Sequence, residues 1–270
     1  MITPQSPLPD VAREARRIVD AMTARDLAVR LLGGLGVAAH DHGEVPATLL
    51  REFADIDVVT GARDGRGAAA TLVALGYMPN DRFNALHGAR RMLFYDNGNG
   101  RQLDVFVGAF AMCHQLDLDD RLGWHPSALA ASDLLLTKLQ IVEINHKDVL
   151  DALRLLLGHE VTEAELPARR DPAGDEDVVD TLSSGRLAEV THADWGWYTT
   201  FTDNLRKVGE AAAGFLDPTS AGLVAARIRT VLTALDGSRK TARWKARAMV
   251  GRRVPWYELP EEVAGTGAHR

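Results

Sequence analysis

The sequence predicts an α/β fold (α+β in stricter terms), in which a small mixed β-sheet with flanking helices precedes a helical C-terminal region. Up to about residue 125, apolar runs that alternate as strands do are interspersed with segments of helical spacing. From residue 127 onward the spacing is helical. We therefore expect a core over 1–125 and a mostly helical region over 126–270. An acidic stretch with prolines predicts a loop or insertion at 159–185.

The composition is that of a soluble globular protein. Of the 270 residues, 46% are hydrophobic and 25% are charged, and the net charge of −6 argues against a general nucleic-acid or membrane binder. The single cysteine, Cys113, excludes an intramolecular disulfide and a multi-cysteine zinc site. The first residues lack the pattern of a signal peptide, and apolar runs fall short of the about 20 residues that span a bilayer. We expect a cytoplasmic protein with no membrane partner.

The N-terminal segment combines a helix, a strand and a paired glycine. Residues 10–25 have helical spacing, and 27–32 reads as a strand that ends at Gly33 and Gly34. Without Cβ atoms, these glycines allow a sharp turn and a close approach to a ligand. A helix beginning within 35–40 would direct free N–H groups toward phosphate. By itself, a Gly-Gly turn at such a junction is structural in most proteins.

The next strand, expected over 54–60, carries two carboxylates. Asp55 and Asp57 are two residues apart, so their side chains project from the same face of the strand, with Cα atoms about 7 Å apart. On a solvated strand such a pair is usually only surface charge. Whether the pair is surface charge or part of a metal site depends on the residues around it.

A β-hairpin supplies the third carboxylate. Strands at 90–95 and 101–107 are joined by Asp96-Asn-Gly-Asn-Gly100, and Asn-Gly favours a tight turn. Asp104 lies on the return strand. If that strand pairs with 54–60, three carboxylates converge and repel unless a cation neutralises them. Mg²⁺ is the expected cation, because it prefers oxygen ligands and keeps waters for a phosphate-bearing substrate.

A second cluster of metal-ligand types occurs at His40-Asp41-His42. A His-x-His spacing beside an aspartate suits zinc. Gly43 and Pro46 mark the segment as a loop, so we interpret it as a solvated loop.

The C-terminal region reads as a series of helices. Ser132 is expected to cap a helix over 133–143 that contains Lys138, and a second helix over 148–157 ends at Gly158. Further helical spacing covers 195–213 and 219–235. Residues 239–253 hold seven Lys or Arg and no acid. We interpret this stretch as a solvated helix face rather than as an RNA contact.

Together these motifs resemble the nucleotidyltransferase superfamily typified by DNA polymerase β. Its signature is an apolar strand ending in Gly-Gly or Gly-Ser, Asp-x-Asp on the next strand and a later third carboxylate. Here these elements are Leu31-Leu-Gly33-Gly34, Asp55-Ile-Asp57 and Asp104. The stretch from Arg51 to Asp57 is similar to the Arg-x-Ser/Thr-x-Asp-Ile-Asp form of the AbiEii-like branch. The segments Leu134–Lys138 and Lys147–Asp151 look like that branch's second motif, so the resemblance covers roughly residues 25–155.

The resemblance implies a site for a nucleoside triphosphate such as ATP. Asp55 and Asp57 would hold Mg²⁺, with Mn²⁺ as the alternative ion, against the triphosphate. Asp104 would complete a second metal position and draw a proton from the attacking hydroxyl. Lys138 would contact the triphosphate, and Asp148 would help to build the site. Gly33 and Gly34 would lie under the phosphates, and Arg51 would join Lys138 in balancing the leaving pyrophosphate.

The implied function is transfer of a nucleoside monophosphate from NTP to an acceptor hydroxyl on RNA (tRNA included), protein or a small molecule. Two residues depart from the family pattern: Phe53 replaces a hydroxyl residue, and Leu35 stands where many members have Ser or Thr. They support the alternative of a catalytically inactive nucleotidyltransferase-fold protein that binds a nucleotide or a partner. A third class, a structural interaction protein, predicts no Mg²⁺-dependent nucleotide binding. The base, the acceptor and the oligomeric state stay open.

Overall fold

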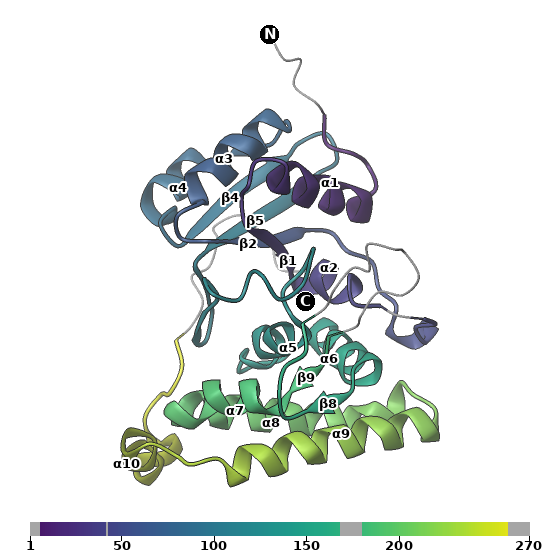
Figure 1. Cartoon of the computed structure of the whole chain (residues 1–270), viewed down its shortest axis with the longest axis vertical. Coiled ribbons are helices and arrows are strands. Elements are labelled where there is room, and N and C mark those ends of the chain that lie inside the picture. The colour runs from purple at the N-terminus through teal and green to yellow at the C-terminus, as the bar shows by residue number, and fades with distance from the viewer. Residues whose placement is uncertain (1–5, 42, 168–179, 259–270) are drawn as a thin grey trace.

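The computed structural model describes residues 6–41, 43–167 and 180–258. Its centre is a five-stranded sheet in the order β1-β2-β5-β4-β3 (Figure 1). Strands β2 and β5 are parallel, and the other neighbouring pairs are antiparallel. The predicted mixed α/β class is confirmed. The strands are β1 (Val29–Leu32), β2 (Ile56–Thr60), β3 (Met78–Pro79), β4 (Arg91–Asp96) and β5 (Arg101–Val107).

Helices cover both faces of this sheet. In Figure 1, α1, α3 and α4 lie above it, and α2 lies below it beside α5 and α6. The upper face buries Ile56, Val58 and Val105 against Ile18 and Met22 of α1, because alternate residues of a strand share one face. The N-terminal helices are α1 (Val11–Thr23), α2 (Gly33–Ala38), α3 (Gly65–Ala74) and α4 (Asp81–His87).

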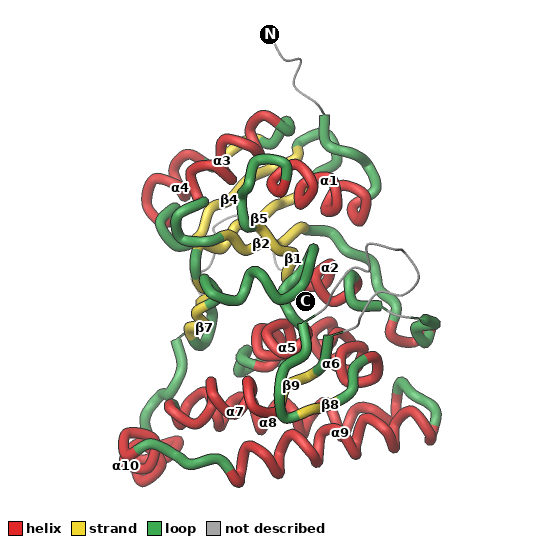
Figure 2. Tube along the Cα trace, in the orientation of Figure 1, coloured by secondary structure: helices red, strands yellow, loops and turns green. Residues whose placement is uncertain are grey.

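The second half of the described chain is helical and packs below the sheet (Figure 2). Its core is continuous with the lower face of the sheet, where Val59 and Phe106 join the leucines of α5 and α6. The helices are α5 (Ala131–Leu139), α6 (His146–Gly158), α7 (Ser184–Ala193), α8 (Trp195–Ala211), α9 (Pro218–Gly237) and α10 (Ala242–Val250).

Short elements complete the described chain. Two small sheets pair β6 with β7 and β8 with β9. These strands and the 3₁₀ turns are β6 (Ala109–Ala111), β7 (Gln115–Asp117), β8 (Val161–Thr162), β9 (Leu182–Ser183), η1 (Ala47–Leu49), η2 (Ala212–Gly214) and η3 (Gly251–Arg253).

Two local predictions, both about α5, differ from the structure. The cap predicted at Ser132 is wrong: α5 begins at Ala131, and the buried Ser132 hydroxyl donates to the Thr181 carbonyl and accepts from the Ser183 N–H. Helix α5 also ends at Leu139, four residues earlier than expected. Within the predicted insertion at 159–185, residues 168–179 lie outside the described part of the chain. The described flanks form β8, β9 and the start of α7.

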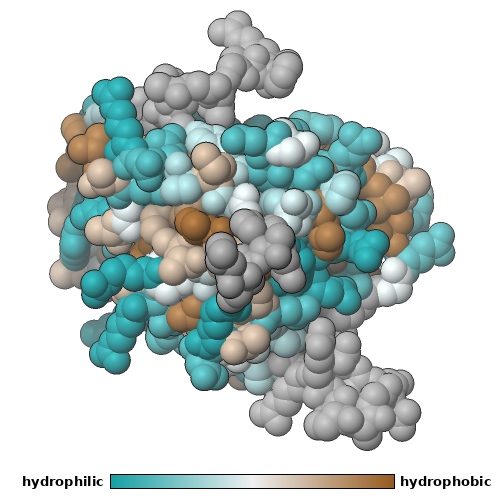
Figure 3. Space-filling model, turned by 90° about the horizontal axis from the view of Figure 1, so that it is seen from above, coloured by the Kyte–Doolittle hydropathy of each residue, from teal (hydrophilic) through white to brown (hydrophobic). Residues whose placement is uncertain are grey.

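The surface is mixed in polarity. Seen from above, hydrophobic residues form separate patches among hydrophilic ones (Figure 3). Within the described residues, every helix is too short or too polar to cross a bilayer.

Candidate active site

Two of the three predicted carboxylates face each other across neighbouring strands. Asp57 of β2 pairs in register with Asp104 of β5, so the expected pairing of these strands is confirmed. Directly paired residues of parallel strands share a face, about 4.8 Å apart between strands. Because Ile56 and Val58 point toward α1, Asp57 points the other way, toward the helical region. Asp55 lies just before β2 and is exposed.

Two of these carboxyl groups, Asp55 and Asp57, have raised pKa values. Burial, with the nearby charge of Asp104, raises the pKa of Asp57 to about 7, although Lys138 opposes the rise. Burial and Asp104 also raise the pKa of Asp55. The carboxylates are therefore close enough to repel, and a cation among them would relieve that repulsion.

Asp104 is oriented by neighbouring strand residues. Arg91 of β4 donates to its Oδ1 over 2.7 Å, and Gln102 donates to its Oδ2 over 2.7 Å. The hairpin register pairs Leu93 with Asp104, so Arg91 is the diagonal neighbour. The sequence analysis missed Arg91. The Asn-Gly turn could have predicted this contact, because it determines the register that places Arg91 beside Asp104.

The paired glycines make room for side chains of the site. A Cβ on Gly33, whose φ is 63°, would lie 2.1 Å from Oδ2 of Asp57. A Cβ on Gly34 would lie 2.0 Å from Nη2 of Arg51. Both glycines are thus required where the end of β1 approaches the carboxylates and the guanidinium.

The predicted cations are held by two aspartates of α6. Arg51 donates two hydrogen bonds to Asp151, over 3.0 and 2.7 Å, and Nζ of Lys138 lies 2.8 Å from both Asp148 and Asp151. Burial alone would raise the pKa of Asp151, but the bonds from Arg51 and Lys138 lower it. Burial would lower the pKa of Lys138, but Asp148 and Asp151 raise it. Asp151, not predicted as a site residue, is the carboxylate that joins both cations.

The carboxylates at β2 and β5 lie near Lys138 and Arg51. The charge of Lys138 acts on Asp57, and Gly34 links Arg51 to the turn that contacts Asp57. The structure thus brings together all eight sequence-predicted site residues. They are Gly33, Gly34, Arg51, Asp55, Asp57, Asp104, Lys138 and Asp148.

The donor set fits Mg²⁺. All the candidate ligands are carboxylate oxygens, and Oδ2 of Asp57 lies in the space that a Cβ on Gly33 would fill. The ligand atoms of Asp55, Asp57 and Asp104 do not all lie within 4.8 Å of one another, as those of a closed three-ligand cage would. Mg²⁺ is usually bound by one or two carboxylates, with waters and substrate phosphates completing its shell. The open arrangement suits that mode.

The predicted solvated loop after α2 is wrong at His40. This residue is 2% exposed, and Asp41 forms an ion pair with Arg154. His42 lies outside the described residues. The environment of His40 is taken up below.

No family model matches the chain, and no curated protein matches it. A solved structure of the antibiotic-resistance factor ANT(2'')-Ia aligns with a TM-score of 0.37 and 15% sequence identity. The alignment covers 53% of this chain and 81% of that one. The case for function therefore depends on the side chains of the site.

Proposed function

We propose that the protein is a Mg²⁺-dependent nucleotidyltransferase that transfers a nucleoside monophosphate from NTP to an acceptor hydroxyl. The observation that carries the proposal is the position of Asp57. It faces Asp104 on one side of the sheet, burial and the charge of Asp104 raise its pKa to about 7, and the charge of Lys138 acts on it. Carboxylates that need a cation, beside cations that suit a phosphate, are what phosphoryl transfer requires.

The carboxylates have distinct roles in this proposal. Asp55, Asp57 and Asp104 would hold Mg²⁺, which when bound supplies charge stabilisation to the phosphoryl group. Arg91 and Gln102 keep Asp104 in one orientation. Each carboxylate oxygen has a second lone pair, so Asp104 would still accept the proton of the attacking hydroxyl.

The cations keep donors available for phosphate. Lys138 uses two of its three N–H donors on Asp148 and Asp151. Arg51 has five N–H donors, of which Nε and Nη2 each use one on Asp151 and Nη1 uses one on the carbonyl of Glu52. Asp151 therefore positions both cations without exhausting them. Their remaining donors would bind the triphosphate and the leaving pyrophosphate.

The two departures from the family pattern fit an active site. Phe53 lies under the guanidinium of Arg51, with 4.8 Å from Cζ to the ring centre, and so supports that side chain. Leu35 is 5% exposed and packs in the core beneath α1. These contacts favour activity over the inactive alternative.

A large cavity lined by aromatic and basic side chains would suit an RNA acceptor. Its volume is about 920 Å³, and tryptophans and arginines line it, with Asp194 and Glu258. Arg90 at its edge precedes Arg91, which binds Asp104. Unpaired bases stack on aromatic side chains, and arginines neutralise phosphates. The aromatic and basic residues are Arg90, Trp195, Trp197, Arg243, Trp244, Arg247, Trp256 and Tyr257.

The two parts of the chain divide these tasks. In the proposed division, the core over 1–125 supplies the carboxylates and the glycine turn. The region over 126–270 supplies Lys138, Asp148 and Asp151, together with most of the cavity. The site would lie where the two parts pack together.

The decisive experiment incubates the purified protein with each labelled NTP, Mg²⁺ and fractionated cell extract. We expect label in the RNA fraction, pyrophosphate release that depends on Mg²⁺, and loss of both in Asp57→Asn. Asp20→Asn, at an exposed position of α1, is the matched control. Nucleotide binding without pyrophosphate release would favour the inactive binding protein. No nucleotide binding, measured as an unchanged Tm with every NTP, would favour a structural interaction protein.

A further inference from the structure

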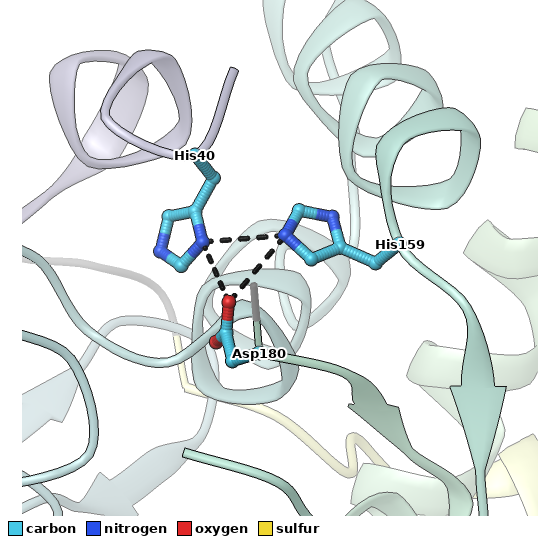
Figure 4. Close-up of side chains that lie close together, drawn as sticks. All are labelled: His40, His159 and Asp180. Atoms are coloured by element: carbon cyan, nitrogen blue, oxygen red, sulfur yellow. Dashed lines mark hydrogen bonds and ion pairs between the residues drawn. The ribbon is translucent and has the colours of Figure 1, made fainter. Parts of the chain in front are cut away.

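A second cluster of ligand-type side chains is buried away from the carboxylates. His40 follows α2, His159 follows the end of α6, and Asp180 precedes β9 (Figure 4). They are 2%, 1% and 1% exposed. The ring nitrogens His40 Nδ1 and His159 Nε2 are 3.3 Å apart, and Oδ1 of Asp180 lies 3.1 Å from the first and 3.6 Å from the second.

Backbone carbonyls determine which nitrogen of each ring carries the proton. Nε2 of His40 lies 2.8 Å from the carbonyl oxygen of Leu129, and Nδ1 of His159 lies 2.9 Å from that of Leu155. A carbonyl oxygen only accepts, so these two nitrogens carry hydrogen. In a neutral ring the other nitrogen carries a lone pair. The lone pairs of His40 Nδ1 and His159 Nε2 therefore face the cluster.

The carboxylate is oriented in the same way. Oδ2 of Asp180 accepts a hydrogen bond of 2.7 Å from the Ala131 N–H, which leaves Oδ1 facing the two ring nitrogens. Two ring nitrogens and a carboxylate oxygen thus meet in a buried space. Histidines whose outer N–H binds a carbonyl, beside an oriented carboxylate, form the arrangement typical of metal ligands.

The spacing of the three atoms matches tetrahedral coordination. With bonds of about 2.0–2.1 Å, ligand atoms of a tetrahedral zinc site lie about 3.3 Å apart. The observed separations of 3.1, 3.3 and 3.6 Å bracket that value. A point just above the plane of the three atoms therefore lies about 2 Å from each of them.

A third histidine nearby takes a different role. His125 stacks on His40 with ring centres 4.2 Å apart. Its Nδ1 accepts from the Ser127 and Ala128 N–H groups, so that lone pair is turned away from the cluster. A cavity of about 80 Å³ also borders His40 and reaches Gly158, the residue before His159.

We propose that His40, His159 and Asp180 bind one divalent transition-metal ion of the zinc class, with water as the fourth ligand. Two imidazoles and a carboxylate are ligands that zinc accepts. The ion would tie α2, α6 and β9 together, and so join the two parts of the chain. It would be separate from the Mg²⁺ site, whose ligands are all oxygens. The rival occupant is a proton shared between a ring and Asp180.

The first test measures metal in the wild-type protein. We expect about one zinc per chain by elemental analysis, or uptake of one equivalent after chelation. Saturating Zn²⁺ would raise the Tm of the stripped protein by about 5 °C or more. Co²⁺ would give the strong visible absorption of a tetrahedral site with nitrogen ligands. Repeating the titration in Asp57→Asn separates this site from the carboxylates.

Variants assign the ligands. His159→Gln and Asp180→Asn are expected to abolish the Co²⁺ band and to weaken Zn²⁺ binding by more than about 100-fold. His192→Gln, at a half-buried histidine of α7 outside the cluster, is the matched control and should retain both. If the buried variants fail to fold, the wild-type stoichiometry and spectrum still decide. A protein that takes up no Zn²⁺, or a Co²⁺ band that survives His159→Gln, would overturn the proposal in favour of the shared proton.

Discussion

Mg²⁺ binding at the proposed active site should depend on the ionisation of Asp57. The pKa of this carboxyl is raised to about 7 by burial and by Asp104. A metal binds the ionised form, so binding below pH 7 must release a proton. For one proton with this pKa, the apparent Mg²⁺ affinity at pH 6 should be about tenfold weaker than at pH 8.

The same shift makes the stability of the protein depend on pH. The folded pKa lies above the ordinary value of 3.8, so the fold favours the protonated form. This contribution is complete below about pH 4 and is lost as the pH rises through 7. A shift of this size corresponds to about 4 kcal/mol, which bound Mg²⁺ would offset.

Two assays examine this coupling. Calorimetric titration of Mg²⁺ in buffers of different ionisation enthalpy gives both the affinity and the protons released. Thermal unfolding between pH 6 and 8 should show a Tm that falls without Mg²⁺ and a larger gain from Mg²⁺ at pH 8. In Asp57→Asn both dependences should disappear. Equal Mg²⁺ affinity at pH 6 and pH 8 in the wild type would refute the electrostatic account of the site.

Three further substitutions probe the geometry. Gly33→Ala should abolish nucleotidyl transfer, because its Cβ displaces Asp57. The control Gly100→Ala has nearly the same φ of 65° and open space around it. In an unfolding titration this control should lose only about 1–2 kcal/mol of stability, the cost of backbone strain. Lys138→Met should lower kcat/KM for NTP by about 100-fold or more while Mg²⁺ binding persists, and steady-state kinetics that show an unchanged kcat/KM would exclude the phosphate role. Asp151→Asn should lower the free energy of unfolding by about 3–5 kcal/mol, because it removes the carboxylate partner of Arg51 and leaves Lys138 with Asp148 alone. Denaturant titration measures that loss.

Much of the sheet follows from local chemistry in the sequence. The Asn-Gly turn predicts the hairpin of β4 and β5, and the alternation around Asp57 predicts which residues share its face. These features can be predicted because turn preference and strand pleat depend on only a few neighbouring residues. The cap at Ser132 shows where local reasoning fails. There the hydroxyl bonds Thr181 and Ser183 from a distant segment, and α5 begins at Ala131 instead.

By itself, the sequence determined the mixed α/β class, the glycine turn and the acidic pair, because each depends on a short run of residues. Only the tertiary structure placed Asp151 between Lys138 and Arg51, and only it gathered His40, His159 and Asp180. Arg51 and Asp151 are 100 residues apart in the chain, and His40 is 119 residues from His159 and 140 from Asp180. Lys138 and Asp151 are closer in the chain, on the neighbouring helices α5 and α6, and so are His159 and Asp180. Contacts of this kind arise when helices pack against the lower face of the sheet. Local periodicity in the sequence does not predict them.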